Sequence, residues 1–346
     1  MIPSNIFIGK SLQVEVKDFF TKNNFSKIGV LVDENTLAHC YPVLKNYIPA
    51  HFVIEIKSGE ENKNLDTCTH IWNELTKHQL DRKALLINLG GGVIGDMGGF
   101  CAATYKRGIN FVQMPTTLLS MVDASVGGKL GVDFDGFKNH IGVFQEPMAV
   151  FIDSMFLNTL SIRELRSGFA EIIKHNLIAD TQAWGAMKTK KMSEFVWEDT
   201  IKHSVGIKAN VTAKDPKENG LRKILNFGHT LGHAVESYLL PQGDRKLLHG
   251  EAIAVGMIVE AWLACEKKFI KPAELKEITN YIISVYGLVS LSADDIKQLV
   301  PLTLQDKKNE SNAVLFSLLE KVGVANYNIE ITENEMYDAM YYYMSL

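Results

Sequence analysis

Apolar and polar residues follow two different patterns along the chain, and the change falls near residue 160. In the first third, short apolar runs at 27–32, 51–56 and 84–89 end in acidic residues, a turn or glycines. Between them, apolar residues recur with helical spacing at about 36–47 and 65–78. Strands separated by helices of this length need crossover connections, which predicts a mostly parallel sheet.

The second half of the sequence has helical spacing and few β-type runs. The pattern predicts helices at about 162–186, 194–213, 223–239, 248–268 and 272–286, a late strand at 326–332 and a terminal helix at 333–344. We therefore predict an α/β domain at residues 1–160 and a mainly α-helical domain at residues 161–346. No linker sequence separates the two, and neighbouring domains of this kind usually share a cleft in which pockets form.

Composition excludes several classes of protein. The 346 residues are 46% hydrophobic and 22% charged, with a formal net charge of −4, so neither a disordered chain nor a nucleic-acid or membrane partner is favoured. The longest apolar stretch, Ala252 to Cys265, is interrupted by Glu260 and is too short to span a bilayer. The first residues lack the pattern of a secretory signal, and the four cysteines form no C-x-x-C pair. These features predict a cytoplasmic protein with reduced thiols.

A glycine cluster follows the third predicted strand. The segment Gly90 to Asp96 matches G-x-G-x-x-G and precedes a helical stretch at 97–106, a place where backbone N–H groups can bind a pyrophosphate. A tight strand-to-helix turn explains the same glycines. The cluster also departs from the common dinucleotide unit, because it does not follow the first strand and no acidic residue lies about 20 positions further on. The next acidic residue is Asp123.

Cations and glycines gather downstream of this cluster. Lys129 and Lys138 lie in two glycine-rich segments that we predict to be turns, with Arg107 just before them. Their neighbours are glycine, valine, leucine and phenylalanine, so these cations favour anion recognition over an ordinary solvated surface. Lysines that lie along the surface with exposed ammonium groups are the alternative for each one taken alone.

The helical half carries a carboxylate and clustered histidines. Glu171 and Lys174 are three residues apart, so they share a helix face, where a simple salt bridge is the common outcome. His229 and His233 are four residues apart, and His249 follows soon after. One carboxylate with two imidazoles suits Zn²⁺ with an open position. Core histidines without a metal explain the same residues singly.

Taken together, these segments resemble the 3-dehydroquinate synthase family over about residues 58–308. The segments that carry the resemblance are GGGVIGDMGGFCAATYKRG, MPTTLLSMVDASVGGKLGVDFDGFKNHIG, GFAEIIKH, GLRKILNFGHTLGHAVES and LHGEAIAVGM. The resemblance implies a dinucleotide-binding α/β domain, a helical C-terminal domain, a site between them and a homodimer. It implies NAD and one Zn²⁺ or Co²⁺ as cofactors, and a small-molecule sugar phosphate, 3-deoxy-D-arabino-heptulosonate 7-phosphate, as the substrate.

The resemblance also implies roles for individual residues. The implied metal ligands are Glu171, His229 and His249. The implied NAD contacts are Asp33, Glu60, Lys63, Gly91, Gly92, Val93, Asp96, Thr116, Thr117, Asp123, Lys138, Thr159, Leu160 and Glu164. The implied substrate and catalytic residues are Arg107, Asp123, Lys129, Asn139, Lys174, Lys208, Glu218, Arg222, Asn226, His233 and Lys307, the last in preference to Lys308.

The implied reaction is a transient oxidation by NAD⁺, loss of phosphate, reduction by the same NADH and an intramolecular aldol closure. Lys129, Asn139 and Arg107 would hold the phosphate, with His233 and Lys307 as further candidates for it. Lys174, Lys208 and Arg222 would hold the carboxylate and ring oxygens. NAD is then recycled and not consumed.

Three other functions fit part of the sequence. Another sugar phosphate cyclase, such as a valiolone or 2-deoxy-scyllo-inosose synthase, would share fold and cofactors, but Lys208, Asn226 and Lys307 favour dehydroquinate synthase. A metal-dependent alcohol or glycerol dehydrogenase would release NADH, and the segments around Lys129 and Asn139 argue against it. A non-catalytic nucleotide-binding protein would not need the full set of metal and phosphate residues.

Overall fold

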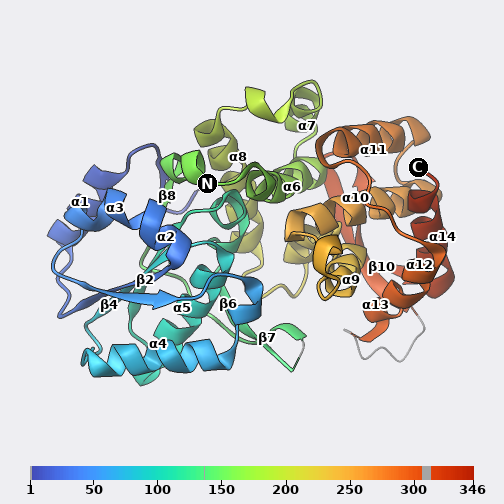
Figure 1. The fold of residues 1–346 in the computed structure, drawn as a ribbon. Coiled ribbons are helices and arrows are strands. Elements are labelled where there is room, and N and C mark those ends of the chain that lie inside the picture. Colours follow the sequence, from blue (N-terminus) through green and yellow to red (C-terminus); the bar gives the residue numbers. More distant parts are fainter. Residues whose placement is uncertain (1, 136, 306–312) are drawn as a thin grey trace. The chain divides into compact units, whose positions relative to one another are not determined.

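The computed structural model describes residues 2–135, 137–305 and 313–346 (Figure 1). The chain divides into two compact units, Met1–Leu165 with Trp197–Asn210, and Arg166–Val196 with Val211–Leu346. The first division lies five residues beyond the boundary expected from the sequence. In addition, most of helix α8 (Trp197–Lys214) belongs to the first unit, where its buried Lys208 pairs with Asp123.

The first unit is built on a parallel sheet, as predicted. The strand order is β1-β8-β5-β4-β2-β3, and every pairing is parallel. The strands are β1 (Ile6–Gly9), β2 (Ile28–Asp33), β3 (Phe52–Ile56), β4 (Leu85–Gly90), β5 (Asn110–Pro115) and β8 (Ala149–Asp153). All six residues of β4 are buried, which explains its continuous apolar run.

Helices cover this sheet, and their ends follow local sequence signals. They include α1 (Gln13–Lys22), α2 (Glu34–His39), α3 (Tyr41–Leu44), α4 (Leu65–Lys77) and α5 (Gly92–Thr104). The single helix predicted at 36–47 is wrong, because the chain breaks at Cys40 and restarts at a helix with Pro42 in its first turn. Residues of α4, α5 and the sheet form one apolar core, which includes Leu31, Ile71 and Met97.

The two lysines of the glycine-rich segments lie in strands and not in turns, so the prediction is wrong for them. Lys129 begins β6 (Lys129–Phe134) and Lys138 lies in β7 (Phe137–Phe144), and the two strands pair antiparallel. The glycines before Lys129 do lie in a bend, where Gly127 and Gly128 have φ of +96° and +63°. Gly131 and Gly142 face each other across this pair, and a Cβ added to Gly142 would lie 2.4 Å from the carbonyl oxygen of Leu130. These glycines therefore permit close approach of two strands.

The second unit is mainly helical, as predicted. Its helices are α6 (Ile162–Ala179, whose first residues belong to the first unit), α7 (Thr181–Met187), α9 (His229–Leu239), α10 (His249–Glu266), α11 (Pro272–Tyr286), α12 (Ala293–Leu299), α13 (Leu302–Gln305) and α14 (Glu333–Met344). The predicted late strand is β10 (Val324–Thr332), which pairs antiparallel with an unpredicted strand, β9 (Ala313–Lys321).

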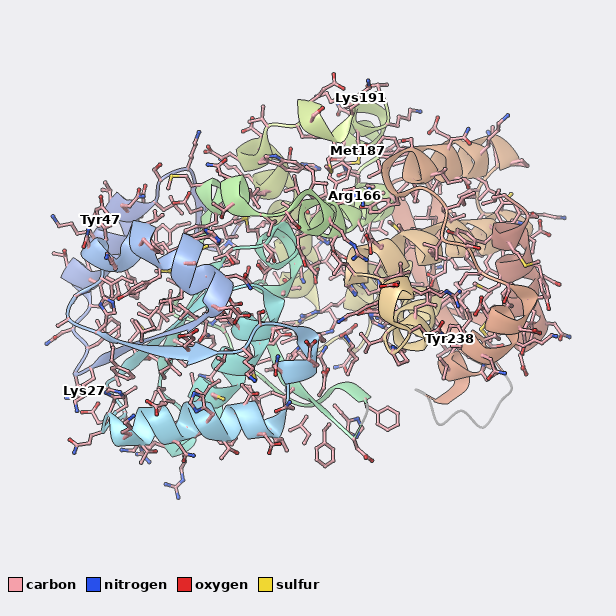
Figure 2. All side chains as sticks on the ribbon, in the orientation of Figure 1. Lys27, Tyr47, Arg166, Met187, Lys191 and Tyr238 are labelled. Carbon is pink, nitrogen blue, oxygen red and sulfur yellow. The ribbon has the colours of Figure 1, made fainter. Side chains whose placement is uncertain are left out.

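Helix α10 explains the longest apolar stretch of the sequence. It is buried over almost its whole length, because α9, α11, α14 and β9 pack around it. By contrast, charged side chains such as Lys27 and Lys191 are exposed at the surface (Figure 2). Among the described residues, none of the helices combines the length and apolar character needed to cross a membrane.

Candidate active site

The carboxyl ends of the parallel strands bring the expected cofactor residues of the first unit to one edge. Asp33 ends β2, Gly91 follows β4, and Thr116 follows β5. These three strands are neighbours, and the order of the chain reverses between β2 and β4. In open α/β sheets, ligands bind outside the carboxyl ends of the strands at such a reversal.

The glycine cluster forms the start of helix α5, which begins at Gly92, five residues before the helical stretch predicted at 97–106. Gly91 is the N-cap, and a Cβ there would lie 3.1 Å from Cγ2 of Thr117. A Cβ at Gly98 would lie 2.1 Å from Oδ1 of Asn88. The glycines thus let a helix N-terminus approach the sheet edge closely, and such an N-terminus is suited to an anion.

The buried Lys63 links the start of helix α5 to the β6–β7 hairpin. Nζ of Lys63 donates to Oδ2 of Asp96 at 2.7 Å and to Oδ1 of Asn139 at 2.6 Å. The backbone N–H of Asn139, which has φ of +51°, donates to Asp133. Lysine only donates hydrogen bonds, so the Asn139 amide must present its oxygen to Lys63 and its NH₂ group elsewhere.

Burial and neighbouring charges shift the pKa values of Lys63 and Asp96 in this network. Burial acts to lower the pKa of Lys63, but Asp96 and Glu60 outweigh it and the pKa is raised. The pKa of Asp96 is also raised, because burial outweighs the attraction of Lys63. The network therefore holds Lys63 as a cation at neutral pH.

Other residues expected in the first unit form ion pairs or lie near strand ends. Nζ of Lys138 lies 3.0 Å from Glu60, and Nζ of the buried Lys208 lies 2.5 Å from Asp123 and donates to its carbonyl oxygen. Arg107 and Lys129 are exposed. The remaining expected contacts, Gly92, Val93, Thr159, Leu160 and Glu164, lie in the first turn of α5 or after β8.

In the second unit, three helices bring the expected metal ligands together. Oε1 of Glu171 on α6 lies 3.5 Å from Nε2 of His229 on α9 and 3.8 Å from Nε2 of His249 on α10. The other oxygen, Oε2, contacts the ammonium of Lys174. Glu171 and Lys174 are both fully buried, so this pair differs from an ordinary surface salt bridge.

The two histidines direct their Nε2 atoms toward Glu171, because hydrogen bonds hold their Nδ1 atoms on the other side of each ring. Nδ1 of His229 is 3.1 Å from the carbonyl oxygen of Phe227, and Nδ1 of His249 is 3.0 Å from Oε2 of Glu236. A carbonyl or carboxylate oxygen only accepts a hydrogen bond, so in both rings Nδ1 carries the hydrogen that it donates. Metal-binding histidines are commonly oriented in this way.

The pKa values of Glu171, His229 and His249 are shifted in different directions from their usual values. Burial raises the pKa of Glu171, but Lys174 and His229 outweigh it, and the value lies well below the usual range. Burial and Lys174 hold the pKa of His229 well below its usual value. Burial also acts to lower the pKa of His249, but Glu171 and Glu236 raise it to about 10.

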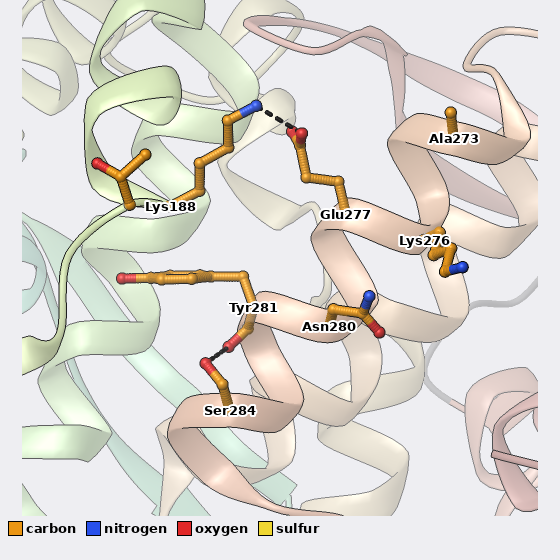
Figure 3. Close-up of a pocket in the computed structure, with 8 residues that line it drawn as sticks. Lys188, Ala273, Lys276, Glu277, Asn280, Tyr281 and Ser284 are labelled. Carbon is orange, nitrogen blue, oxygen red and sulfur yellow. Dashed lines mark hydrogen bonds and ion pairs between the residues drawn. The ribbon is translucent and has the colours of Figure 1, made fainter.

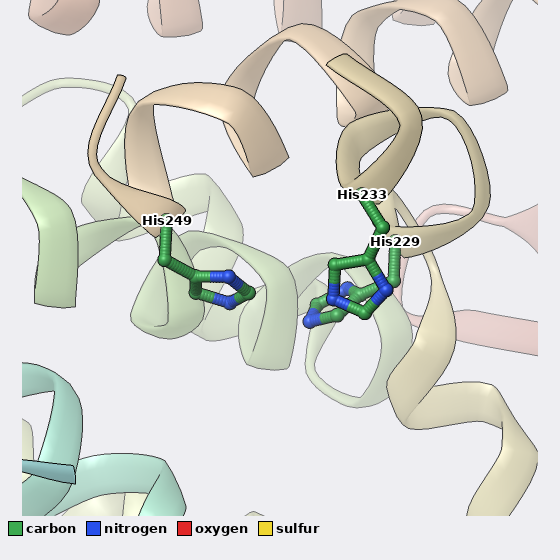
Figure 4. Close-up of side chains that lie close together, drawn as sticks. All are labelled: His229, His233 and His249. Carbon is green, nitrogen blue, oxygen red and sulfur yellow. The ribbon is translucent and has the colours of Figure 1, made fainter. Parts of the chain in front are cut away.

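His233 lies beside the expected ligands. Ligand atoms of His229, His233 and His249 all lie within 4.8 Å of one another, and Figure 4 shows the three rings facing a common region. Their ring centroids are 5.1 to 5.7 Å apart. A carboxylate oxygen and three imidazoles therefore converge in this unit, a donor set that suits a divalent transition metal.

The remaining expected substrate residues lie before α9. Arg222 and Asn226 are in the 3₁₀-helix η7 (Leu221–Asn226), and Nδ2 of Asn226 donates to Glu218 at 2.9 Å. The carboxylate of Asp215 accepts from three backbone N–H groups of this turn, including that of Arg222 at 3.0 Å. Asp215 was not expected from the sequence. Lys307 and Lys308 lie outside the described residues.

Glu236 and Glu260 are the other residues that the sequence analysis missed. Glu236 holds His249, and Glu260 accepts hydrogen bonds from the backbone at the start of α9. Glu260 did carry a signal, since it interrupts an apolar run. Glu236 carried none, because an acidic residue near a helix end looks like a solvated one.

An open groove of about 580 Å³ in the second unit does not include the expected site residues (Figure 3). It runs along α11 beside Lys188, whose ammonium is 2.5 Å from Glu277. Trp184 donates to the same carboxylate at 2.9 Å. The groove is therefore a surface feature, and the ion pair of Lys188 and Glu277 forms part of its lining.

The sequence is similar to family models and to named proteins of other organisms. A family model described as 3-dehydroquinate synthase N-terminal matches residues 53–167, and one described as 3-dehydroquinate synthase C-terminal matches residues 168–309. A protein named 3-dehydroquinate synthase from Parabacteroides distasonis is 37% identical over 349 residues, covering 99% of this chain and 98% of the relative. One from Acetivibrio thermocellus is 43% identical over 286 residues, covering 81% and 76%.

Solved structures share the fold. The 2-epi-5-epi-valiolone synthase from Streptomyces hygroscopicus, with NAD⁺ and Zn²⁺ bound, has a TM-score of 0.85 and 24% identity, covering 100% of this chain and 98% of that one. A 2-deoxy-scyllo-inosose synthase complexed with carbaglucose-6-phosphate, NAD⁺ and Co²⁺ has a TM-score of 0.83 and 23% identity, covering 97% and 95%. The glycerol dehydrogenase from Schizosaccharomyces pombe has a TM-score of 0.65 and 16% identity, covering 100% and 90%. At these identities the likeness concerns the fold.

Proposed function

This chain belongs to the 3-dehydroquinate synthase family, and on that premise we propose that it converts 3-deoxy-D-arabino-heptulosonate 7-phosphate to 3-dehydroquinate and phosphate. The reaction class is a carbon–oxygen lyase acting on a phosphate. The observation that carries the proposal is the convergence of Glu171, His229 and His249 in a chain whose two halves match both models of the family.

We propose NAD⁺ and one Zn²⁺ or Co²⁺ as cofactors, and the residues present fit both. Gly91 leaves a space beside Thr117 that a Cβ would reduce, at the sheet edge where a dinucleotide is expected. Both carboxylate oxygens of Glu171 are buried without a well-formed hydrogen bond, and the Nε2 atoms of two oriented imidazoles face one of them. When bound, NAD⁺ would supply a reversible hydride acceptor and the ion would supply a Lewis acid.

In this proposal the residues of the second unit hold the ion and the polar groups of the substrate. Glu171 provides one oxygen for the ion, while Lys174 pairs with the other and keeps the carboxylate ionised. Arg222 is buried, and its guanidinium donates to the carbonyl oxygen of Pro216 while its backbone N–H donates to Asp215, so the guanidinium is fixed in advance. A fixed guanidinium suits the planar carboxylate of the substrate.

The first unit would hold the phosphate. Lys129 begins β6, and the amide of Asn139 in β7 is oriented by Lys63. The NH₂ group of Asn139 and the ammonium of Lys129 both donate hydrogen bonds, as a phosphate requires. Arg107 is exposed and would add a third donor. The leaving phosphate itself accepts the eliminated proton, so this step needs no strong base from the protein.

Other sugar phosphate cyclases and metal-dependent dehydrogenases share this fold, as the solved structures illustrate. They differ in what they consume and release. A cyclase of another type would release phosphate from a different sugar phosphate. A dehydrogenase would accumulate NADH in proportion to substrate.

The test is a phosphate-release assay with the heptulosonate phosphate, followed alongside NADH absorbance. We expect phosphate and 3-dehydroquinate in equal amounts with no net NADH. Release of phosphate only from a different sugar phosphate would instead support another cyclase. Stoichiometric NADH without phosphate would support a dehydrogenase.

We further propose a cytoplasmic homodimer. All four cysteines are free thiols, and Cys40, Cys68 and Cys101 are buried, as suits a reducing compartment. The dimer follows from the family, and light scattering coupled to size-exclusion chromatography tests it.

A further inference from the structure

Glu260 is a buried carboxylate in the apolar helix α10. Its side chain is fully inaccessible to solvent. Oε2 accepts from the backbone N–H of Gly228 at 2.5 Å, and Oε1 accepts from those of Thr230 at 3.0 Å and Leu231 at 3.3 Å. A buried charge is costly unless such donors compensate it, so its presence among alanines and valines calls for a reason.

The three donors surround a single expected metal ligand. Helix α9 begins at His229, its N-cap is Gly228, and Glu260 accepts from the residues on both sides of that histidine. Gly228 has φ of +81°, a conformation that L side chains rarely adopt. The carboxylate thus fixes the turn from which the His229 ring projects.

Glu260 also joins the two helices that carry the two imidazoles. It lies on α10, which begins with His249, and it caps α9, which begins with His229. The helices pack so closely that a Cβ on Gly256 would lie 1.9 Å from the carbonyl oxygen of Gly228. An N-cap serine or aspartate on α9 itself would accept from Thr230 or Leu231, the N–H groups inside the first turn, without tying α9 to α10.

We propose that Glu260 is a positioning residue for the metal centre, which sets the first turn of α9 so that Nε2 of His229 faces Oε1 of Glu171 and Nε2 of His249. The inference rests on the proposed metal in the proposed function. Residues that orient metal ligands through hydrogen bonds typically change metal affinity by about 10- to 100-fold when they are mutated.

The test compares Glu260→Gln with a matched control, Asp153→Asn. Asp153 is a buried carboxylate in the first unit that also accepts from three backbone N–H groups, those of Ser11, Leu12 and Met155. Both variants turn one oxygen into an NH₂ group that opposes backbone donors. Each metal-free protein would be titrated with Co²⁺ in competition with a chelator, and the visible Co²⁺ spectrum and the melting temperature would be recorded.

We expect both variants to melt at lower temperature, and only Glu260→Gln to bind Co²⁺ about 10- to 100-fold more weakly with an altered spectrum. Unchanged Co²⁺ affinity and spectrum in Glu260→Gln would overturn the inference and leave only a helix cap. If Glu260→Gln does not fold, Glu260→Asp keeps the charge but is too short to reach all three donors, and it should show the same loss of affinity. Wild-type protein that binds no Co²⁺ or Zn²⁺ would overturn the proposed function itself.

Discussion

In the metal-free protein, His249 should hold a proton that an incoming metal ion must displace. Its ring lies beside two carboxylates, Oε2 of Glu236 at 3.0 Å and Oε1 of Glu171 at 3.8 Å. Burial opposes the charge, but these carboxylates raise the pKa of His249 to about 10. His229 is the opposite case, because burial and Lys174 keep its pKa well below the usual value.

The magnitude follows from the pKa of His249. At about pH 7.5, a group with a pKa of about 10 is deprotonated in only about 0.3% of molecules, so competition with the proton weakens metal binding about 300-fold. His229 and Glu171 have already lost their protons at that pH. The logarithm of the apparent metal affinity should therefore rise by about one unit per pH unit between about pH 7 and 9.

Chelator-buffered Co²⁺ titrations of the metal-free protein at several pH values measure this slope. The control is Glu236→Gln, which removes one of the two carboxylates, lowers the pKa of His249 and should make the slope flatten at a lower pH. A slope near zero in the wild-type protein would mean that both imidazoles are already neutral, and a slope near two that both are charged. Either result would refute the reasoning.

Three further predictions concern the first unit and the cofactor. Lys129→Met should lower kcat/KM for the sugar phosphate about 30- to 1,000-fold, which corresponds to about 2–4 kcal/mol for one preorganised contact, while NAD⁺ affinity measured by fluorescence stays the same. Lys63→Met should weaken the binding of both NAD⁺ and substrate, measured as higher KM values in steady-state kinetics, since Lys63 orients Asp96 and Asn139 together. The control Lys77→Met, on the surface of α4, should change neither KM. Turnover should continue with NAD⁺ far below the substrate concentration, and a phosphate yield that stops at the amount of NAD⁺ added would contradict its recycling.

Much of the fold was predictable because its signals are local. The apolar runs of β2, β3 and β4 and the ends of α11 and α14 follow directly from periodicity and caps. Strand β9 was missed, since its leucine-rich run has no alternation and only pairing with β10 makes it a strand. The break at Cys40 was also missed, because the flanking residues keep helical spacing on both sides.

The candidate site was predictable only in part. Spacing alone indicated that Lys174 would meet Glu171 one helical turn away, and that His229 and His233 would share a face. The approach of α6, α9 and α10 depends on tertiary packing, and only the resemblance to a family indicated it. Of the groups that orient the ligands, Glu236 has no local signal, and Glu260 was marked only as an interruption of an apolar run.

The pairing of β1 with β8 has a consequence for synthesis of the chain on the ribosome. Ile6 pairs with Val150, 144 residues further along, and Asp153 then binds the backbone of Ser11 and Leu12. At about 5–20 residues per second, the first strand must wait about 7–30 s for its partner. During that interval β1 has no partner strand, because β8 is its only neighbour among the described strands of the sheet. The N-terminus should therefore be the part of this unit that depends most on chaperones until β8 has been synthesised.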